Sequence, residues 1–367
     1  MHALIHANFA ARAAMRLITP PAVLPAWRQG QAVGEWREIS GTALSSVAPT
    51  PTPAGNTGPS SKVDAWCSFA LDTRSNKLYS AAGGGHNDYA GNEVDVLDLS
   101  QDSPAWSELR APTAAGSVVS NSAYYSDGRP SARHTYYGVV ICEQNDELMI
   151  FGGNVYGATG VLTDDVAVFD LLSGDWKADG TRPNMPAGST YLQGHPTALD
   201  PATGDVYVLS NEMVNRWTRS SNSWSERVPQ YGGPYGFEAM SAFDSNRNRI
   251  LVVGGLADAT KLYTLSGDAM STPTLTGSAS SINTQDGAGM VYVPAIDKYL
   301  VRLGGSGGTV YQVDAASWDV STFATSGGAS VPAATNGPYN RFLYVPDLGG
   351  CVYVPSYSGD AWFLRVH

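Results

Sequence analysis

The sequence predicts an all-β fold, a six-bladed β-propeller in which four-stranded sheets stand around a central axis. Three observations lead to this prediction. The 367 residues include 40 glycines and 22 prolines but only 15% charged residues, which favours short strands and tight turns over helices. A hairpin pattern returns roughly every 50 residues, a period typical of propellers. A tryptophan-bearing strand pattern near the start of the chain supplies the strand that the last repeat lacks.

Six copies of one hairpin run along the chain. Each copy has an apolar strand, a turn opened by Asp, Glu or Pro, and a second strand that alternates Val, Leu, Ile and Tyr. Asp and Pro suit such turns because Asp caps local N–H groups and Pro fixes φ. The turns are spaced by 71, 57, 44, 50 and 52 residues, and an insertion near residues 111–132 explains the long first interval. The turn residues are Asp72, Glu143, Asp200, Asp244, Pro294 and Pro346.

Several copies continue in the same way after the hairpin. A diglycine ends the second strand in most of them, an apolar third strand follows, and a fourth strand carries a tryptophan. The third and sixth copies have Ser210-Asn211 and Pro355-Ser356 in place of the diglycine. The tryptophans of the fourth strands are Trp106, Trp176, Trp224 and Trp318.

The sixth copy ends before its outer strand, because the chain stops shortly after the segment GDAWFLRV. Residues 35–40 carry Trp36 in the position that the other outer strands give to their tryptophan. Pairing this segment with the last blade closes the ring and removes two exposed edges, which would otherwise invite aggregation. We therefore predict an extended N-terminal arm at residues 1–29 and a closed propeller at 30–367.

The repeats resemble the kelch-repeat family of β-propellers, including the central propeller of galactose-oxidase-like proteins. Those repeats also combine a diglycine, an apolar or aromatic strand and a late tryptophan. Residues 136–176 match best, and the resemblance covers roughly residues 30–367. Segments such as EWREISGTALSSV, GGGHNDYAGNEVDVLDL and SARHTYYGVV are also similar to kelch-type proteins of tailed bacteriophages. The resemblance implies the fold but no activity, because propellers host unrelated functions.

The charge and the cysteines exclude several classes of function. The net charge of −11 repels phosphate backbones and anionic lipids, so we expect no nucleic-acid partner. No apolar run is long enough to cross a bilayer. Cys67, Cys142 and Cys351 each lie in an apolar strand pattern, which predicts buried thiols rather than disulfides or metal ligands. Residues 1–21 lack a basic region of the secretory type, so we expect no secretion signal.

The stretch GGGHNDYAGNE, residues 83–93, lies between the second and third strands of the first repeat. Such loops and those that join the blades open at one end of the ring, which we call the ring face and where propellers usually bind ligands. Two interpretations stay open: turn chemistry beside a wet channel explains such residues without a ligand, or they form a binding site. The candidate binding residues are His86, Asp88, Tyr89, Arg133, Glu238 and Asp286.

Long loops add to the case for recognition. They are rich in Tyr, Ser, Asn and Gly, a composition that suits adaptable contact with a polar surface or a sugar. An equally good interpretation is that long loops simply fill the ring face. The loops are residues 110–135, 179–195, 231–237 and 325–341.

Two enzymatic chemistries can be weighed against the residue types present. Copper-radical oxidation of the galactose-oxidase kind needs a Tyr-His pair, and the chain has no such dipeptide. The calcium-loop pattern is incomplete in DSNRNR, so we expect no metal and no cofactor.

The second chemistry is that of a lyase acting on uronic acids, which needs a Tyr or His base and a cation beside the substrate carboxylate. Its candidate residues are His134, Tyr136, His195 and Arg341.

These observations favour a non-enzymatic binding or structural propeller in the virion of a tailed phage, made in the host cytoplasm. We expect it to be oligomeric within an assembly, to contact other virion proteins through the N-terminal arm, and to recognise a glycan or protein on the ring face. The alternatives are a secreted carbohydrate-active enzyme, most plausibly a polysaccharide lyase, and a cytoplasmic protein-interaction propeller.

Overall fold

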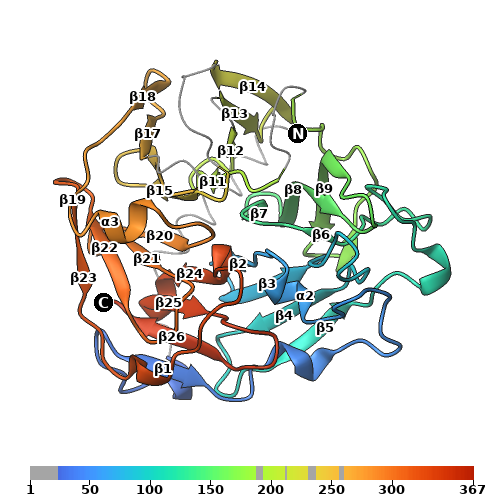
Figure 1. Cartoon of the computed structure of the whole chain (residues 1–367), viewed down its shortest axis with the longest axis horizontal. Helices are drawn as coiled ribbons and strands as arrows, with labels where there is room; N and C mark the ends of the chain where they lie inside the picture. Colours follow the sequence, from blue (N-terminus) through green and yellow to red (C-terminus); the bar gives the residue numbers. More distant parts are fainter. Residues whose placement is uncertain (1–23, 187–192, 211–212, 230–236, 256–259) are drawn as a thin grey trace, which may run out of the picture.

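The computed structural model shows six β-sheets arranged as a ring around one axis, and Figure 1 looks down that axis. The predicted all-β, six-bladed propeller is confirmed. The structure describes residues 24–186, 193–210, 213–229, 237–255 and 260–367.

Blades 1 to 3 follow one another along the chain, each with its first strand nearest the axis (Figure 1). Blade 1 consists of β2 (Ala70–Asp72), β3 (Lys77–Ala81), β4 (Val94–Asp98) and β5 (Trp106–Arg110). Blade 2 consists of β7 (Val139–Cys142), β8 (Glu147–Val155), β9 (Leu162–Asp170) and β10 (Asp175–Trp176), and β6 (Arg133–His134) pairs with the far end of β8. Blade 3 consists of β11 (Thr197–Leu199), β12 (Val206–Ser210), β13 (Met213–Thr218) and β14 (Ser223–Val228).

Blades 4 to 6 complete the ring. Blade 4 consists of β15 (Met240–Asp244), β16 (Arg249–Val253), β17 (Lys261–Thr264) and β18 (Ala269–Ser271). Blade 5 consists of β20 (Gly289–Val293), β21 (Lys298–Arg302), β22 (Val310–Asp314) and β23 (Asp319–Phe323), with β19 (Thr276–Gly277) added parallel to β23. Blade 6 consists of β24 (Phe342–Val345), β25 (Gly350–Tyr353), β26 (Ala361–Arg365) and β1 (Trp36–Ile39).

Helical segments are short and lie in the connections. Within the described ranges, no helix is long and apolar enough to cross a membrane. The α-helices among the described residues are α2 (Ser61–Asp64) and α3 (Ser280–Asn283). The 3-10 turns are η2 (Ala26–Arg28), η3 (Leu44–Val47), η4 (Ala115–Ser117), η5 (Gly328–Ser330), η6 (Tyr339–Arg341) and η7 (Pro346–Leu348).

The first hairpin of every blade turns in the same way. Where Asp opens the turn, its carboxylate accepts backbone N–H groups, as Asp244 does from Asn246 at 3.0 Å. Four residues after the turn begins, the backbone is left-handed, a conformation that Asn, Asp and Gly tolerate best. Turns that begin at Asp72, Cys142, Asp200, Asp244, Val293 and Val345 place Asn76, Asp146, Gly204, Asn248, Asp297 and Gly349 in this position.

The N-terminal strand closes the ring as predicted. β1 pairs antiparallel with β26, with Trp36 opposite Leu364 and Ile39 opposite Ala361. The indole N–H of Trp36 donates to the carbonyl of Gly308 in blade 5 at 2.9 Å, so the closing strand also bridges two blades. Most of the predicted arm, residues 1–29, lies outside the described residues. Its last part rests on blade 6, where the ring of Trp27 packs edge-on against Phe363 at 5.2 Å.

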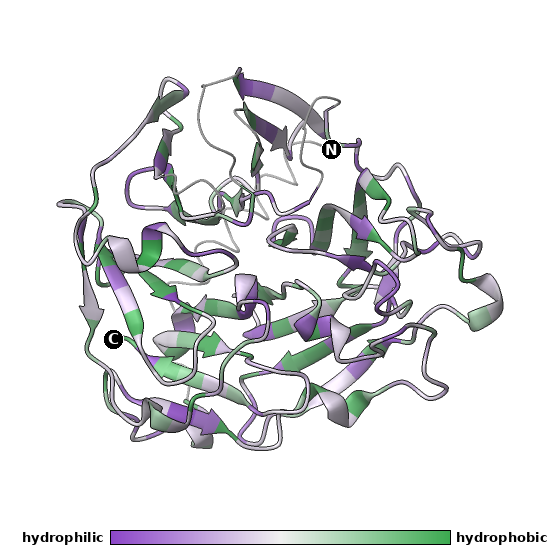
Figure 2. Cartoon of the chain, in the orientation of Figure 1, coloured by the Kyte–Doolittle hydropathy of each residue, from purple (hydrophilic) through white to green (hydrophobic). Residues whose placement is uncertain are grey.

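The hydrophobic core fills the spaces between neighbouring blades. Figure 2 shows apolar residues concentrated in the strands and polar residues in the loops that join them. Between blades 1 and 6, for example, Leu78 and Leu97 pack in one cluster with Val352 and Phe363. The three cysteines are buried and free, as the sequence predicts; they are Cys67, Cys142 and Cys351.

Candidate functional site

Six positions, one per blade, share an uncommon backbone conformation just before the innermost strand. Each lies six residues before its hairpin turn begins and has a positive φ between 44° and 63°. Such a φ is unfavourable for large side chains, so its occurrence in four non-glycine residues indicates that the surrounding structure imposes it. The six residues are Trp66, Tyr136, Gly194, Glu238, Gly287 and Tyr339.

The six positions form a belt around the axis, and backbone hydrogen bonds link them in two runs. The N–H of Tyr136 donates to the carbonyl of Trp66 at 2.7 Å, and that of Glu238 donates to Gly194 at 2.6 Å. The belt continues from Gly287 to Glu238 at 3.1 Å and from Tyr339 to Gly287 at 2.8 Å. These bonds fix the entrances of blades 1 and 2 relative to each other, and those of blades 3 to 6 relative to one another.

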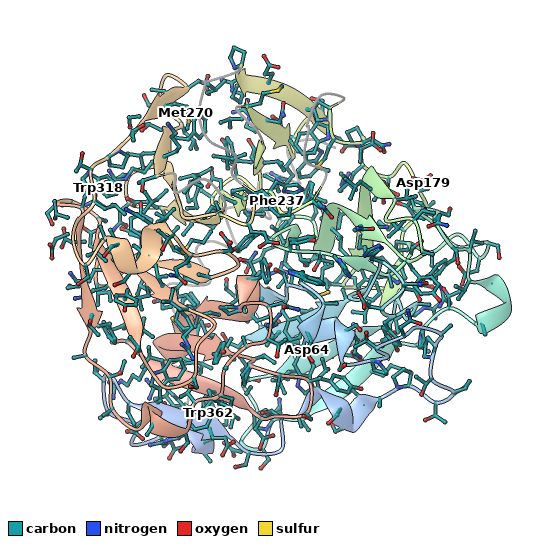
Figure 3. The ribbon with its side chains drawn as sticks, in the orientation of Figure 1. Asp64, Asp179, Phe237, Met270, Trp318 and Trp362 are labelled. Atoms are coloured by element: carbon teal, nitrogen blue, oxygen red, sulfur yellow. The ribbon has the colours of Figure 1, made fainter. Side chains whose placement is uncertain are left out.

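The side chains of this belt converge on the axis. Tyr136 comes from blade 2 and Tyr339 from blade 6, yet their rings meet edge-on at 5.8 Å. Phe237 adds a ring 5.9 Å from Tyr136, and Figure 3 shows Phe237 near the centre of the propeller. Trp66 packs against the same cluster. Tyr136 and Tyr339 are buried and form a floor, whereas Trp66 and Phe237 are half-buried.

Tyr137 closes the axis beneath this floor. Its hydroxyl donates to the carbonyl of Ala288 in blade 5 at 2.8 Å, although Tyr137 belongs to blade 2 on the opposite side of the ring. The amide of Asn340 donates to the Tyr137 carbonyl at 3.2 Å. The axis is therefore filled by tyrosine at this level rather than by an open channel. Below it, the innermost strands line an axial cavity of about 250 Å³.

A second cluster joins the belt at the seam between blades 1 and 2. Nε2 of His134 lies 2.9 Å from Oδ2 of Asp88, and this contact lowers the pKa of Asp88. The ring of His134 also packs 5.0 Å from Trp66, 5.9 Å from His86 and 6.1 Å from Tyr136. His86 is exposed, Asp88 is half-buried, and His134 is buried. The structure therefore brings the predicted residues His86, Asp88, His134 and Tyr136 together.

The glycine run before His86 makes this cluster possible. Gly85 has a φ of +76°, and a Cβ there would lie 2.3 Å from the carbonyl of Asn154 and 2.5 Å from the backbone nitrogen of His134. Only glycine lets the loop approach β6 and β8 so closely. The glycines therefore serve the turn, and the turn brings Asp88 to His134.

Glu238 and Asp286 form the acidic side of the belt. Burial first, and the charge of Asp286 second, raise the pKa of Glu238 to about 7. Glu238 is half-buried and Asp286 is exposed, so both predicted residues are accessible.

Tyr89 and Arg133, two of the predicted binding residues, are fully buried instead. The Tyr89 hydroxyl donates to Oε1 of Glu93 at 2.8 Å, and Glu93 in turn pairs with Lys62 at 3.0 Å. The guanidinium of Arg133 pairs with Asp165 at 2.8 Å and also donates to the carbonyls of Ala123, Ser131 and Gly152. Both buried side chains make hydrogen bonds to neighbouring segments and so hold the loops together.

His195 and Arg341, proposed for the lyase alternative, are buried as well. Burial lowers the pKa of His195 to about 4, which keeps it neutral, and its Nδ1 lies 2.9 Å from the Thr197 hydroxyl. Arg341 uses its guanidinium to join blades 6 and 1, donating to the carbonyls of Val63, Cys67, Gly337 and Val354. Both side chains are therefore buried, whereas a lyase needs a base and a cation that reach its substrate.

Four residues that converge here are absent from the sequence-based prediction: Trp66, Tyr137, Phe237 and Tyr339. Their signal is positional. Trp66 and Tyr339 stand six residues before a hairpin turn, and Tyr137 and Phe237 are neighbours of residues at that position. The signal appears only after each hairpin is aligned on the residue where its turn begins.

The chain matches no protein-family model, and a search of curated proteins finds no match. Among solved structures it is similar to one titled "Structure of YjhT", with 15% sequence identity and a TM-score of 0.50. The alignment covers 86% of this chain and 95% of that one. At this identity the likeness shows a shared β-propeller fold and no more.

Proposed function

We propose that this chain is a binding propeller that recognises a neutral or cationic ligand, such as a glycan without acidic groups, on its ring face. The observation that supports this most is the convergence of Trp66, Tyr136, Phe237 and Tyr339 on the axis beside Glu238 and Asp286. Half-buried aromatic rings offer flat apolar contact to a sugar or a cation, and carboxylates accept hydrogen bonds from hydroxyl or ammonium groups.

The charges on this face favour such a ligand over an anion. The arginines that precede the innermost strands, Arg133 and Arg341, are buried and paired to protein acceptors. Parts of the predicted recognition loops 179–195 and 231–237 lie outside the described residues. Residues 187–192, 211–212, 230–236 and 256–259 contain no Lys or Arg.

A glycan array tests this function. Labelled full-length protein should bind neutral or amino sugars, and Phe237→Ala should lose the signal because it removes an aromatic ring of the belt. Phe323→Ala is the matched control, since Phe323 is also half-buried but lies on β23, an outer strand of blade 5. Equal binding by the Phe237 variant would contradict a site on the axis.

We further propose that this propeller is of the kelch type and works within a tailed-phage virion. The sequence resemblance supports this setting. Ring closure uses residues 36–39, so the segment before residue 24 is not needed as a blade strand. Deleting residues 1–22 should leave a folded propeller that no longer enters particles. Normal incorporation of the truncated chain would contradict docking through the arm.

The second candidate is a lyase, favoured by the orientation of His134 by Asp88 next to Tyr136. Such a pair resembles a base with its orienting carboxylate. A uronate substrate also needs a cation beside its carboxylate, and Arg341 is engaged with four backbone carbonyls. Formation of unsaturated products from polyuronates, followed by ultraviolet absorbance and abolished by His134→Ala, would replace the binding function with the enzymatic one.

A further inference from the structure

A cavity of about 390 Å³ lies on the outer wall of the propeller, between blades 1 and 2. This volume lies within the usual range of ligand sites, roughly 300–1,000 Å³. The cavity is far from the axis, because β5 and β10 are the outermost strands of their blades. Asp179, next in sequence to the lining, is at the periphery of the ring in Figure 3. The lining residues are Arg110, Asp127, Gly128, Arg129, Asp175, Trp176, Lys177 and Ala178.

One wall of this cavity comes from the insertion at residues 111–132, part of which projects at the right of Figure 1. Hydrogen bonds hold its tip in place. The N–H of Gly128 donates to the carbonyl of Tyr125 at 2.9 Å, and the hydroxyl of Thr113 donates to the carboxylate of Asp127 at 2.8 Å. Arg129 donates back to the carbonyl of Ala111 at 3.1 Å. The insertion has no part in closing the ring, yet it folds into an ordered wall of a cavity.

Cationic groups gather here in a chain whose net charge is −11. Each lies beside a carboxylate: Nε of Arg110 is 2.9 Å from Asp175 but makes no hydrogen bond among the described residues, and Nε of Arg129 is 3.6 Å from Asp127. Lys177 pairs with Glu147 at 2.8 Å and with Asp170 at 3.1 Å. Within the described part of the chain, neither Nη group of Arg110 makes a hydrogen bond. Guanidinium groups with free N–H donors suit a carboxylate ligand.

Trp176 gives the cavity its aromatic surface. Its ring packs edge-on against Phe169 at 5.2 Å, which fixes its orientation. Its indole nitrogen is buried and has no hydrogen-bond partner among the described residues. The lining holds no aliphatic side chain larger than that of Ala178. A ligand with hydroxyl groups and a flat ring face therefore suits the cavity better than one with aliphatic side chains.

We propose that this outer-wall cavity binds a saccharide that carries a carboxylate. The carboxylate lies toward Arg110 and Arg129, the sugar ring packs on Trp176, and Asp175 accepts a hydroxyl hydrogen bond. An acidic peptide offers the same charge, but the cavity lining has no large aliphatic side chain against which the methylene groups of its side chains could pack. The site is separate from the ring face and does not depend on the function proposed there.

Calorimetric titration of the full-length protein tests this assignment. The probes are tri-galacturonate, its methyl ester, and tri-glutamate. Tri-galacturonate should bind. In the Phe237→Ala variant, whose ring face no longer binds neutral sugars, the ester should bind at least about tenfold more weakly than tri-galacturonate, because it keeps the sugar rings but loses the charge. Arg110→Gln and Arg129→Gln should each weaken binding by a similar factor. Trp176→Phe, which keeps the packing on Phe169, should also weaken it.

Two controls make the outcome decisive. Lys298→Gln removes a cation of similar exposure that pairs with Asp314 in blade 5, and it should leave binding unchanged. Phe237→Ala alters the ring face and should also leave it unchanged. The assignment is overturned if tri-galacturonate, a mannuronate trimer and a glucuronate disaccharide all fail to bind. It is also overturned if tri-glutamate binds as tightly as tri-galacturonate. The same holds if both arginine variants bind tri-galacturonate as tightly as the wild type does while their melting temperatures are unchanged.

Discussion

At the scale of single residues, backbone conformation decides which side chains reach the ring face. Trp66, Tyr136, Glu238 and Tyr339 all have left-handed backbones, and hydrogen bonds between blades hold them there. The strain of each residue is a small local cost, on the order of 1–3 kcal/mol. This backbone conformation directs four large side chains, each from a different blade, toward the axis at the ring face.

The elevated pKa of Glu238 leads to a pH prediction. Its pKa is about 7 in the folded protein, above the ordinary value of 4.5, so the folded state binds the proton more tightly than the unfolded state. Ionisation of Glu238 therefore lowers the free energy of unfolding. This loss is absent below pH 4.5, grows as pH rises toward 7, and persists above pH 7. We expect Glu238→Gln to raise the melting temperature at pH 8 but not at pH 4.

Thermal unfolding across this pH range measures the effect. Glu226→Gln, at an exposed position on strand β14, is the matched control and should show no such trend. If Glu238→Gln changed the melting temperature by the same amount at every pH, burial and the charge of Asp286 would not be what raises the pKa of Glu238.

Gly85 gives a second prediction at this scale. Gly85→Ala should destabilise the protein by more than about 1 kcal/mol, because the φ of +76° disfavours alanine and the new Cβ meets backbone atoms of Asn154 and His134. Gly116→Ala should be nearly neutral, since nothing lies within 4 Å of its Cβ position. Denaturant unfolding compares the two, and equal stabilities would show that the loop can move away from β6.

At the scale of elements, the closing strand β1 joins the two ends of the ring. β1 covers the whole edge of β26 from Leu364 to Ala361, and Trp36 is buried against blade 5. Deleting residues 1–42 should therefore expose the β26 edge, lower the melting temperature and cause aggregation. Deleting only residues 1–22 keeps β1 and should not. Light scattering during a thermal ramp distinguishes the two, and a monomeric, equally stable 1–42 deletion would contradict closure by β1.

Helix α2 is attached to blade 1 by a buried ion pair. Lys62 lies 2.6 Å from Asp95 and 3.0 Å from Glu93, and all three side chains are almost fully buried. Lys62→Met keeps the length of the side chain but leaves two buried carboxylates without their cation. We expect a loss of about 3 kcal/mol or more in the free energy of unfolding.

Lys77→Met, on β3 of the same blade, is the control and should change stability little because its side chain is only partly buried. Equal effects of the two substitutions in denaturant unfolding would mean that the Lys62 pair does not hold α2 on the blade.

At the scale of the whole molecule, the ring was predictable and the site only partly so. The hairpin period and the displaced tryptophan strand are properties of the chain, and they define six blades and their closure. The burial of Arg341 depends on carbonyls such as that of Val63, 278 residues away in the sequence. A loop pattern places Arg341 at the blade entrance but does not say that its side chain turns between blades rather than toward the axis. His86, Asp88 and His134 were predictable because the loops that carry them meet at one seam.

Ligand binding at the axis of the ring face is tested most directly by hydrogen–deuterium exchange with and without a neutral glycan identified on the array. Binding at the axis predicts slower exchange in the segments before the innermost strands, namely residues 61–68, 134–138, 237–239, 286–288 and 336–341. The outer strands and the hairpin turns at the opposite end should exchange as in the free protein. Protection confined to those turns or to the outer wall, with the axial segments unchanged, would contradict the account.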